Sequence, residues 1–373
     1  MVKNEKTPMI LDLHIPYCVR PERYQDRWFT VGTNEEKNAY LRALKREVLS
    51  YEGDLDGYEI RAVRLGGGSA TVMSPDGLGD LLRTVREKLP VAKGVEISVD
   101  AHPLTICTPA LTGIATGHPT RMELMIHSDI QKELDALDCA FTKQNIQNAV
   151  LFFGRFHVNN VGFTIHYGIP GQTPASWEQT LHACTIMRPA HITVEALHAE
   201  KSAPVAAPSP EERREMYRMA CSHLSANGYI QYSANHFALP RHGWLFQLLA
   251  MDSPAFLGMG VGARSVYDGY YVRNTSNLKH YIQHGGDFEK TTAQAGQLSS
   301  EDAMRAYLFQ HLKSTDGFLM SSFTEKFDAD LPQKAAAYLE DLVQKDFVTS
   351  ENGRYAPTAE GLFAQCEGSF SSY

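Results

Sequence analysis

Short apolar runs and longer stretches of helical periodicity alternate along the first part of the chain. The short runs predict buried strands at residues 10–15, 60–65, 95–99, 121–126, 162–166 and 191–197. Between them, apolar residues at helical spacing predict helices at residues 35–50, 78–89, 130–137, 143–152 and 177–187. Strands that alternate with helices in this way are typical of βαβ units around a parallel sheet, so the pattern predicts an α/β protein.

These units are too few to close an eightfold barrel, and we therefore predict an open, partial (β/α)6 TIM-like barrel. In such folds, ligands bind beyond the carboxyl ends of the strands. Chemically distinctive residues stand at these predicted ends: Cys18, Gly66, Gly67, Gly68, Ser69, Asp100, His127, Tyr167 and Glu195. We therefore expect the functional site at this edge of the sheet.

The pattern changes near residue 299, where the alternation of strands and helices stops. Helices are predicted at residues 300–312 and 334–345, followed by a segment at 347–355 that turns at Asn352-Gly353. An Asn-Gly pair between alternating segments is a strong hairpin signal. The sequence thus predicts a barrel domain over residues 1–298 and a mostly helical, winged-helix-like module over residues 299–373.

Composition narrows the classes of partner. The net charge of −8 argues against a general nucleic-acid binder, which needs a basic face to neutralise phosphates. No apolar run approaches the roughly 20 residues that span a bilayer, so we expect no membrane span. The first residues carry positive charge without an apolar segment of signal-peptide length. We therefore expect a cytoplasmic protein.

Cysteine spacing directs attention to one loop. The chain has six cysteines and no CxxC pair, which excludes a zinc ribbon or a thioredoxin-type redox pair. Most of them are predicted to be small buried hydrophobes, as free cysteines usually are. Cys18 differs, because it follows the first strand in a loop that contains two prolines, Pro16 and Pro21. It alone suggests a functional role.

The Cys18 loop has the shape of a metal-cluster loop. Three thiolates can hold an iron–sulfur cluster and leave one iron open to a substrate or cofactor. Here Glu22 and Gln25 stand where the second and third thiolates would be expected. A carboxylate and an amide are poor substitutes for soft thiolates. We therefore expect no 4Fe–4S cluster in this loop, with Cys18 as a vestigial metal ligand.

The second candidate site is the glycine-rich strand end at residues 66–69. Consecutive glycines free backbone groups that can bind an amine, a carboxylate or a phosphate. Neither a Walker loop nor a Rossmann fingerprint is present, and a tight strand–helix turn explains the glycines equally well. Asp100 suits the hydroxyls of a ribose, although an aspartate at a strand end can also be a helix cap or a solvated turn residue.

Several longer motifs occur in one order along the chain: HIPYC at 14–18 followed by Tyr24, LGGGSAT at 65–71, EISVDAHP at 96–103, HYGIPGQT at 166–173, GYIQYSANHFA at 228–238, FLGMGVGARS at 256–265 and PTAEGLF at 357–363. With them the chain resembles, over nearly its whole length, the radical S-adenosylmethionine family of oxygen-independent coproporphyrinogen III oxidase and its haem-chaperone relatives. The resemblance implies a partial barrel with a C-terminal helical domain. It also implies a CxxxCxxC-bound 4Fe–4S cluster that cleaves S-adenosylmethionine to a 5′-deoxyadenosyl radical.

The sequence departs from the family pattern at the cofactor positions. Besides the two missing thiolates, family contacts for S-adenosylmethionine are replaced by Asp12, His127, Cys139 and Thr164. The haem-chaperone motif HNxxYW corresponds to FQLLAM at 246–251. The resemblance still assigns a cofactor-binding role to the retained residues, which are Tyr24, Gly66, Gly67, Gly68, Ser69 and Asp100.

Three functional hypotheses follow, and the sequence leaves open whether the chain is an enzyme. The first is a pseudoenzyme that serves as a binding scaffold or as the partner of an active radical paralogue, without radical chemistry. The second is an enzyme that uses Glu22 and His127 for acid–base or metal chemistry on S-adenosylmethionine or a tetrapyrrole-like molecule. The third is an active radical enzyme in which Glu22 or Gln25 ligates iron.

Overall fold

The computed structural model describes residues 6–22, 29–198, 205–252, 255–368 and 370. Tyr24 and Gln25, both singled out by the sequence, therefore lie outside the described residues. The chain divides into two compact units. Unit 1 comprises Met1–Phe163 and Pro254–Gln297, and unit 2 comprises Thr164–Ser253 and Leu298–Tyr373. The division at residue 299 that the sequence suggests remains a proposal.

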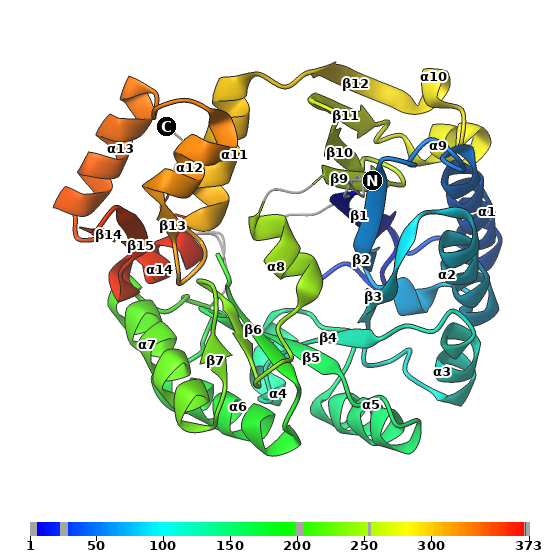
Figure 1. The fold of residues 1–373 in the computed structure, drawn as a ribbon. Coiled ribbons are helices and arrows are strands. Elements are labelled where there is room, and N and C mark those ends of the chain that lie inside the picture. The colour runs from blue at the N-terminus through cyan, green and yellow to red at the C-terminus, as the bar shows by residue number, and fades with distance from the viewer. Residues whose placement is uncertain (1–5, 23–28, 199–204, 253–254, 369, 371–373) are drawn as a thin grey trace. The chain divides into compact units, whose positions relative to one another are not determined.

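Unit 1 is built on a mainly parallel sheet (Figure 1). Its hydrogen-bonded strand order is β12 (Thr292–Gln297), β11 (Tyr270–Asn274), β10 (Arg264–Tyr267), β9 (Ala255–Met259), β1 (Thr7–Ile15), β2 (Tyr58–Gly67), β3 (Val91–Ala101) and β4 (Arg121–His127). Strand β1 runs parallel to both β2 and β9, and β3 runs parallel to both β2 and β4. The pairs from β9 to β12 are antiparallel. The parallel set confirms the predicted βαβ units.

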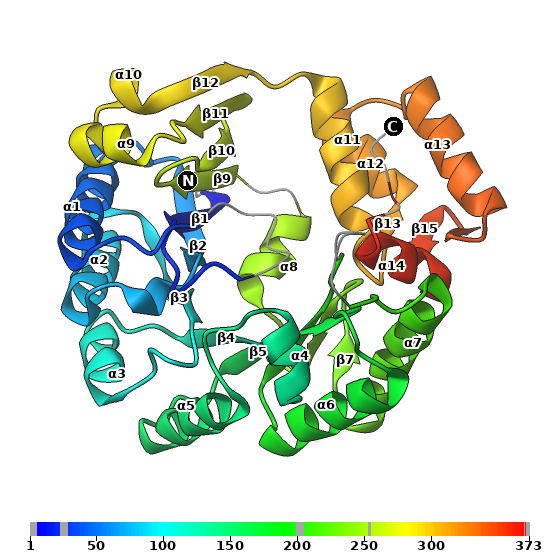
Figure 2. The same cartoon turned by 180° about the vertical axis from the view of Figure 1, so that it is seen from behind.

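Helices flank the parallel strands of unit 1. They are α1 (Asn34–Ser50), α2 (Pro75–Lys88), α3 (Thr108–Ala115), α4 (Gln131–Ala136), α5 (Lys143–Arg155), α9 (Leu278–His284) and α10 (Phe288–Thr291), with a short 3-10 turn at Ala70–Val72. Helices α1, α2 and α3 lie side by side in both views (Figures 1 and 2). The sequence pattern predicted α1, α2, α4 and α5 but missed the short helix α3.

Local chemistry explains where these helices begin. The hydroxyl of Thr33 accepts a hydrogen bond from the backbone N–H of Glu36, which caps α1. Ser74 caps α2 in the same way, with Pro75 in the first turn, where its missing N–H costs nothing. In strand β1, the face formed by Met9, Leu11, Leu13 and Ile15 is fully buried, whereas Asp12 and His14 on the other face are half-buried.

Unit 2 contains the end of β5 (Val161–Tyr167), which starts in unit 1, followed by β6 (His191–Ala196), β7 (Ile230–Gln231) and β8 (His236–Ala238). Strand β8 pairs antiparallel with β6 and β7. Helices α6 (Pro174–Met187) and α7 (Pro210–Ala226) pack against each other, and α8 (Leu245–Met251) follows. Gly228, which follows the end of α7, has a φ of 86°, a conformation that glycine adopts at little cost.

The C-terminal part of unit 2 has the element order of a winged helix. It runs α11 (Ser300–His311), β13 (Phe318–Leu319), α12 (Met320–Phe327), α13 (Gln333–Gln344), β14 (Val348–Glu351), β15 (Arg354–Pro357) and α14 (Ala359–Cys366). The three strands form an antiparallel sheet in the order β13-β15-β14. Asn352 and Gly353 turn the β14–β15 hairpin with φ values of 51° and 76°, as a type I′ turn requires.

The observed class agrees with the sequence pattern. The structure is mixed α/β, and its mainly parallel sheet with flanking helices fits a partial TIM-like barrel. Among the described residues, we find no helix that is both long enough and apolar enough to cross a bilayer.

Candidate functional site

The predicted site residues of unit 1 gather at the carboxyl ends of parallel strands. In the β1–β2 register, His14 lies beside Gly66 and Ile15 lies beside Gly67. Asp100 lies near the end of β3, beside Glu123 in the first half of β4, and His127 is the last residue of β4. Parallel strands end at one edge of a sheet, and the edge where these four strands end is where α/β barrels bind ligands.

Glu22 and His127 meet at this edge. The Nε2 atom of His127 lies 2.8 Å from Oε2 of Glu22, and the two side chains are only 5% and 6% exposed. His127 has a φ of 56°, in the left-handed region that a residue with a Cβ adopts only at some cost. The next residue fixes the turn, because the Ser128 hydroxyl donates to the carboxylate of Glu133 at 2.6 Å. The convergence of Glu22 and His127 is the arrangement that the second sequence hypothesis requires.

Cys139 joins this pair from the loop that follows α4. Ligand atoms of Glu22, His127 and Cys139 all lie within 4.8 Å of one another. Arg20 holds the loop in place: its guanidinium donates to the backbone oxygens of Asp138 and Cys139 at 2.6 and 2.9 Å. Burial raises the pKa of the Cys139 thiol, and the nearby Glu22 carboxylate raises it further. From the sequence, Cys139 was noted only as a replacement of a family contact for S-adenosylmethionine. Its position beside Glu22 and His127 was not predicted.

The rings of Phe141 and His102 lie next to the group formed by Glu22, His127 and Cys139. Phe141 stacks on His127 with ring centroids 5.9 Å apart and planes 14° apart, and it meets His102 edge-on at 5.2 Å. The N–H of Leu104 donates to Nδ1 of His102 at 3.2 Å, which leaves the proton of the neutral imidazole on Nε2. Burial lowers the pKa of His102 to about 4, against the attraction of the Glu22 carboxylate. His102 therefore stays neutral at physiological pH, and sequence patterning gave no signal for it.

Cys18 is buried and turned toward its own loop. Its thiol lies 3.8 Å from the backbone oxygen of Thr30, while its N–H donates to that oxygen at 2.9 Å. Burial raises the pKa of this thiol, the Glu22 carboxylate raises it further, and Lys37 opposes the change. A CxxxCxxC loop offers three thiolates, whereas the described part of this loop offers Cys18 and a carboxylate engaged with His127. These side chains do not match that ligand set.

The glycines at residues 66–68 are required by the chain's own packing. A Cβ on Gly66 would lie 2.1 Å from Oδ2 of Asp100, and one on Gly68 would lie 2.2 Å from the backbone oxygen of Tyr17. The amides of Gly68 and Ser69 donate to the β1 loop, at 2.7 Å to Ile15 and 2.9 Å to Tyr17. The glycine strand end thus holds the Cys18 loop against β2. A ligand-binding role for these residues and for Ser69 remains a proposal.

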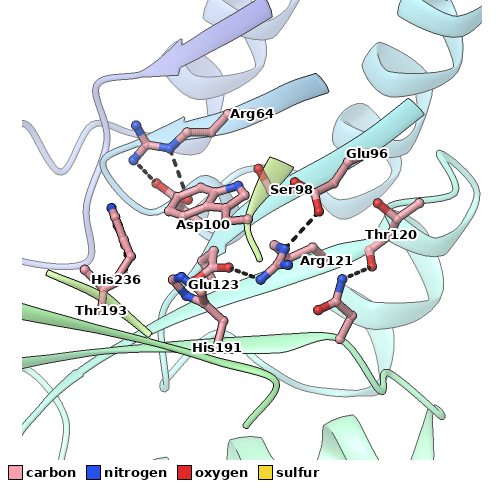
Figure 3. A network of polar contacts seen from close by, with 12 residues as sticks. Arg64, Glu96, Ser98, Asp100, Thr120, Arg121, Glu123, His191, Thr193 and His236 are labelled. Atoms are coloured by element: carbon pink, nitrogen blue, oxygen red, sulfur yellow. Dashed lines mark hydrogen bonds and ion pairs between the residues drawn. The ribbon is translucent and has the colours of Figure 1, made fainter. Parts of the chain in front are cut away.

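Asp100 belongs to a network of charges that sequence reasoning missed (Figure 3). Its carboxylate accepts from Arg64 at 2.6 Å, and Arg64 also lies 3.9 Å from Asp12. The side chains of these three residues are between 17% and 20% exposed, so part of each can reach a ligand. The signal was present in the sequence as charged residues that recur every second position along apolar strands.

A second guanidinium extends this network along β4. Arg121 contacts Glu96 at 3.2 Å and Glu123 at 3.1 Å, and its side chain is 1% exposed (Figure 3). Burial raises the pKa of Glu123 to about 7, Arg121 opposes the change, and Asp100 and Glu96 add to it. Together with Asp12 and Asp100, four carboxyl groups surround two guanidinium groups. Because carboxyl groups outnumber guanidinium groups, the network either favours a cationic ligand or keeps a proton on one of its carboxyl groups.

Two strand-end residues predicted from sequence lie in unit 2 and have contacts there. The hydroxyl of Tyr167 donates to Glu367 at 2.8 Å, and Arg213 binds the same carboxylate at 2.9 Å. Glu195 lies 3.3 Å from Nε2 of His166. Tyr167 thus ties β5 to the C-terminal segment of unit 2.

Comparisons with known proteins agree with this architecture. Residues 298–364 match the HemN C-terminal domain family. The haem chaperone HemW of Lactococcus lactis is 21% identical over 94% of this chain and 93% of its own length. The oxygen-independent coproporphyrinogen III oxidase of Escherichia coli is 25% identical over 84% of this chain and 73% of its own length. The solved structure of Escherichia coli HemN, described as a radical SAM enzyme, matches with a TM-score of 0.82 at 19% identity, over 97% of this chain and 90% of that one.

These matches define the class first: the fold is that of a radical SAM enzyme of the HemN type. Over most of its length the chain is similar to HemN and HemW proteins, which agrees with the resemblance that the ordered motifs indicated.

One expectation needs correction. We expected no 4Fe–4S cluster, and the comparisons contradict this, because the relatives are radical SAM proteins of a family that normally binds such a cluster. The expectation that no cluster is bound relied only on the number of thiols in one loop. A fold brings together ligands from distant segments, as it brings Cys139 to Glu22. A cluster-deficient chain thus has no support, while the described side chains of the Cys18 loop do not by themselves offer three thiolates.

Proposed function

We propose that this chain is a small-molecule-binding scaffold of the HemN/HemW-like type, and that it binds S-adenosylmethionine at the strand ends of unit 1. One observation carries the proposal: Arg64 lies between Asp12 and Asp100 at that edge, and all three side chains are partly exposed. Two carboxylates around one guanidinium leave a net negative site. From the sequence alone, we also propose a cytoplasmic location and an active radical paralogue as partner.

The charge of the site favours one of the two ligands suggested by the family. S-adenosylmethionine carries a sulfonium, an ammonium and a ribose diol, and carboxylates can attract or accept hydrogen bonds from all of these groups. A tetrapyrrole presents carboxylates of its own, which the site would repel. Oδ2 of Asp100 accepts from Arg64 and from the N–H of Gly67, and Oδ1, 3.4 Å from Nε of Arg64, can accept a further hydrogen bond, as from a ribose hydroxyl.

Calorimetry with the full chain tests the proposal. S-adenosylmethionine should bind more tightly than S-adenosylhomocysteine, which lacks the sulfonium, and a porphyrin should bind least. Asp100→Asn should weaken binding about tenfold or more, because a hydrogen bond to a charged group contributes about 1.5–3 kcal/mol. Asp56→Asn is the matched control, since Asp56 is exposed and lies before the opposite end of β2. Equal affinity for both adenosyl compounds, or an Asp100→Asn variant that binds normally, would contradict the proposal.

The Glu22–His127 pair favours a second candidate, an enzyme with non-radical chemistry. A buried carboxylate 2.8 Å from an imidazole can orient the ring and assist proton transfer. Mass spectrometry of S-adenosylmethionine incubated with the protein distinguishes the binding scaffold from the non-radical enzyme. Intact ligand supports the scaffold, and hydrolytic or methyl-transfer products lost in Glu22→Gln support the enzyme. 5′-Deoxyadenosine formed under reducing conditions would contradict both.

A further inference from the structure

Glu22, His127 and Cys139 come from three separate segments of unit 1. Glu22 lies in the loop after β1, His127 ends β4, and Cys139 follows α4. Within the parts of the chain that the structure describes, this is the one group of three or more His, Cys, Asp or Glu residues whose ligand atoms converge. A carboxylate oxygen, an imidazole nitrogen and a thiol sulfur are the three donor types that zinc accepts in proteins.

We infer that these three side chains form a binding site for one divalent transition-metal cation, with Zn²⁺ the best fit to the donors. The inference goes beyond ligand binding at Asp100 and does not depend on it. Three protein donors are the number that catalytic zinc sites use, with a further position left open.

The distances agree with such a site. Zinc bonds of about 2.0–2.3 Å hold tetrahedral donors roughly 3.3–3.7 Å apart. Here the Glu22–His127 separation is 2.8 Å, and all donor pairs lie within 4.8 Å. A cation would therefore need only small side-chain movements, in which it replaces the protons that the three groups share.

The surroundings hold the donors in place. Phe141 stacks on the His127 ring, and Arg20 fixes the backbone oxygen of Cys139 at 2.9 Å. His127 also adopts a left-handed φ of 56°, which keeps its ring at the strand end. Backbone strain that places one particular side chain is common at functional sites.

The inference is tested with cobalt and the chelator-treated full chain, without S-adenosylmethionine. Co²⁺ should bind with a stoichiometry of one and give a thiolate-to-cobalt charge-transfer absorption, and Zn²⁺ should displace it. Cys139→Ser should abolish that absorption, and His127→Asn should weaken binding by about 100-fold or more, because changes around a metal site already cost about 10- to 100-fold. Asparagine tolerates the left-handed φ, so this variant keeps the backbone.

Matched controls are available in the same unit. Cys107 is an exposed thiol, and His157 is an exposed histidine with a φ of 54°, close to that of His127. Cys107→Ser, His157→Asn and Cys18→Ala should all keep the cobalt absorption and affinity. A cooperative melting transition without metal shows that each variant folds, and the zinc-induced rise in melting temperature should be lost only in the ligand variants.

Two results would overturn the inference. One is cobalt binding that survives both Cys139→Ser and His127→Asn. The other is iron with equimolar acid-labile sulfide in protein purified without oxygen, lost in Cys18→Ala and kept in His127→Asn. Neither result depends on whether S-adenosylmethionine binds, so this inference and the proposed function fail separately.

Discussion

Two groups of polar side chains in unit 1 differ in composition: one surrounds the buried carboxylate of Glu47, and the other consists of Glu22, His127 and Cys139. Around Glu47, which is 1% exposed, every partner is a hydrogen-bond donor: the amide of Asn274 at 2.7 Å, the N–H of Gly260 at 2.9 Å and the hydroxyl of Tyr281. Donors and acceptors therefore match within the protein. Such a network fixes α1 against the β9–β11 region and needs no ligand.

The group of Glu22, His127 and Cys139 lacks that match. Each of the three side chains offers one atom that can ligate a metal ion, and these atoms lie within 4.8 Å of one another. The difference teaches how to separate structural from functional burial in this fold. Several hydrogen-bond donors around one acceptor, as at Glu47, indicate that the group stabilises the fold. Several potential metal-ligating atoms close together, as in the Glu22 group, indicate that the group can bind a cation.

The largest expected effect is on stability at Glu47. Glu47→Ala leaves the donors of Asn274, Gly260 and Tyr281 buried without an acceptor, and should lower the free energy of unfolding of unit 1 by about 3–5 kcal/mol. Glu52→Ala, which removes an exposed pair with Lys88, should change it by less than about 1 kcal/mol. Chemical denaturation of the full chain measures both. A mild effect at Glu47 would mean that this network is not structural.

The next largest expected effect is on the pH dependence of stability, and it comes from Glu47 in the same network. Burial raises the pKa of Glu47 from 4.5 to about 7, so the folded state favours the protonated acid. Its contribution is fully present below about pH 4.5 and is lost as the pH rises through about 7, by an amount on the order of 3 kcal/mol. Glu47→Gln, which cannot titrate, should remove this part of the slope. The rotatable hydroxyl of Tyr281 lets the amide fit.

Denaturation midpoints from pH 4.5 to 8 give the measurement for wild type and Glu47→Gln. Glu123, with a pKa raised to about 7 by burial, should add a loss of the same sign in both proteins. A slope that is unchanged in Glu47→Gln would contradict the assignment to Glu47.

The contribution of His102 to stability should depend on pH in the opposite direction from that of Glu47, and it should change at lower pH. Burial lowers its pKa from 6.5 to about 4, so the folded state favours the neutral ring. Its contribution is present above pH 6.5 and is lost as the pH falls through about 4. NMR titration of the imidazole follows it directly, and an exposed histidine such as His157 provides the reference. A His102 that titrates with His157 would show that its ring is accessible to water.

The sequence predicted the fold better than the site, for a physical reason. The apolar periodicity of β1 to β4 and of α1 reflects burial on a length scale of a few residues, which a sequence displays directly. The short helix α3, which has Pro109 in its first turn and Gly113 within it, does not display a clear pattern and was missed. At the candidate site, Glu22 was singled out because it stands where a cluster thiolate is expected, and His127 because it follows a predicted strand; a role for either residue stays a prediction.

Cys139 and Arg64 were not found, because their roles depend on which segments the fold brings together. Cys139 lies far from Glu22 in sequence and reaches it only through the loop that Arg20 holds. The alternation along β2 does not distinguish Arg64 from the other polar residues of that strand, and only the pairing of β2 with β3 puts it beside Asp100.

The smallest expected effect tests how that loop is held. Arg20 is 48% exposed and contacts Asp138 and the backbone of Cys139. Arg20→Ala should therefore change stability by less than about 1 kcal/mol, as exposed ion pairs do. It should still weaken cobalt binding by about threefold to tenfold, less than the loss of a ligand, because Cys139 is no longer fixed against the Glu22 loop.

Arg61→Ala is the matched control, since Arg61 makes an exposed pair with Glu59 at 3.1 Å on β2. It should leave the cobalt affinity unchanged. If both arginine variants bind cobalt like the wild type, the Cys139 loop does not need Arg20 to present its thiol. If Arg20→Ala lowers stability as strongly as Glu47→Ala, the loop is part of the architecture, and the contrast between the two groups fails at this point.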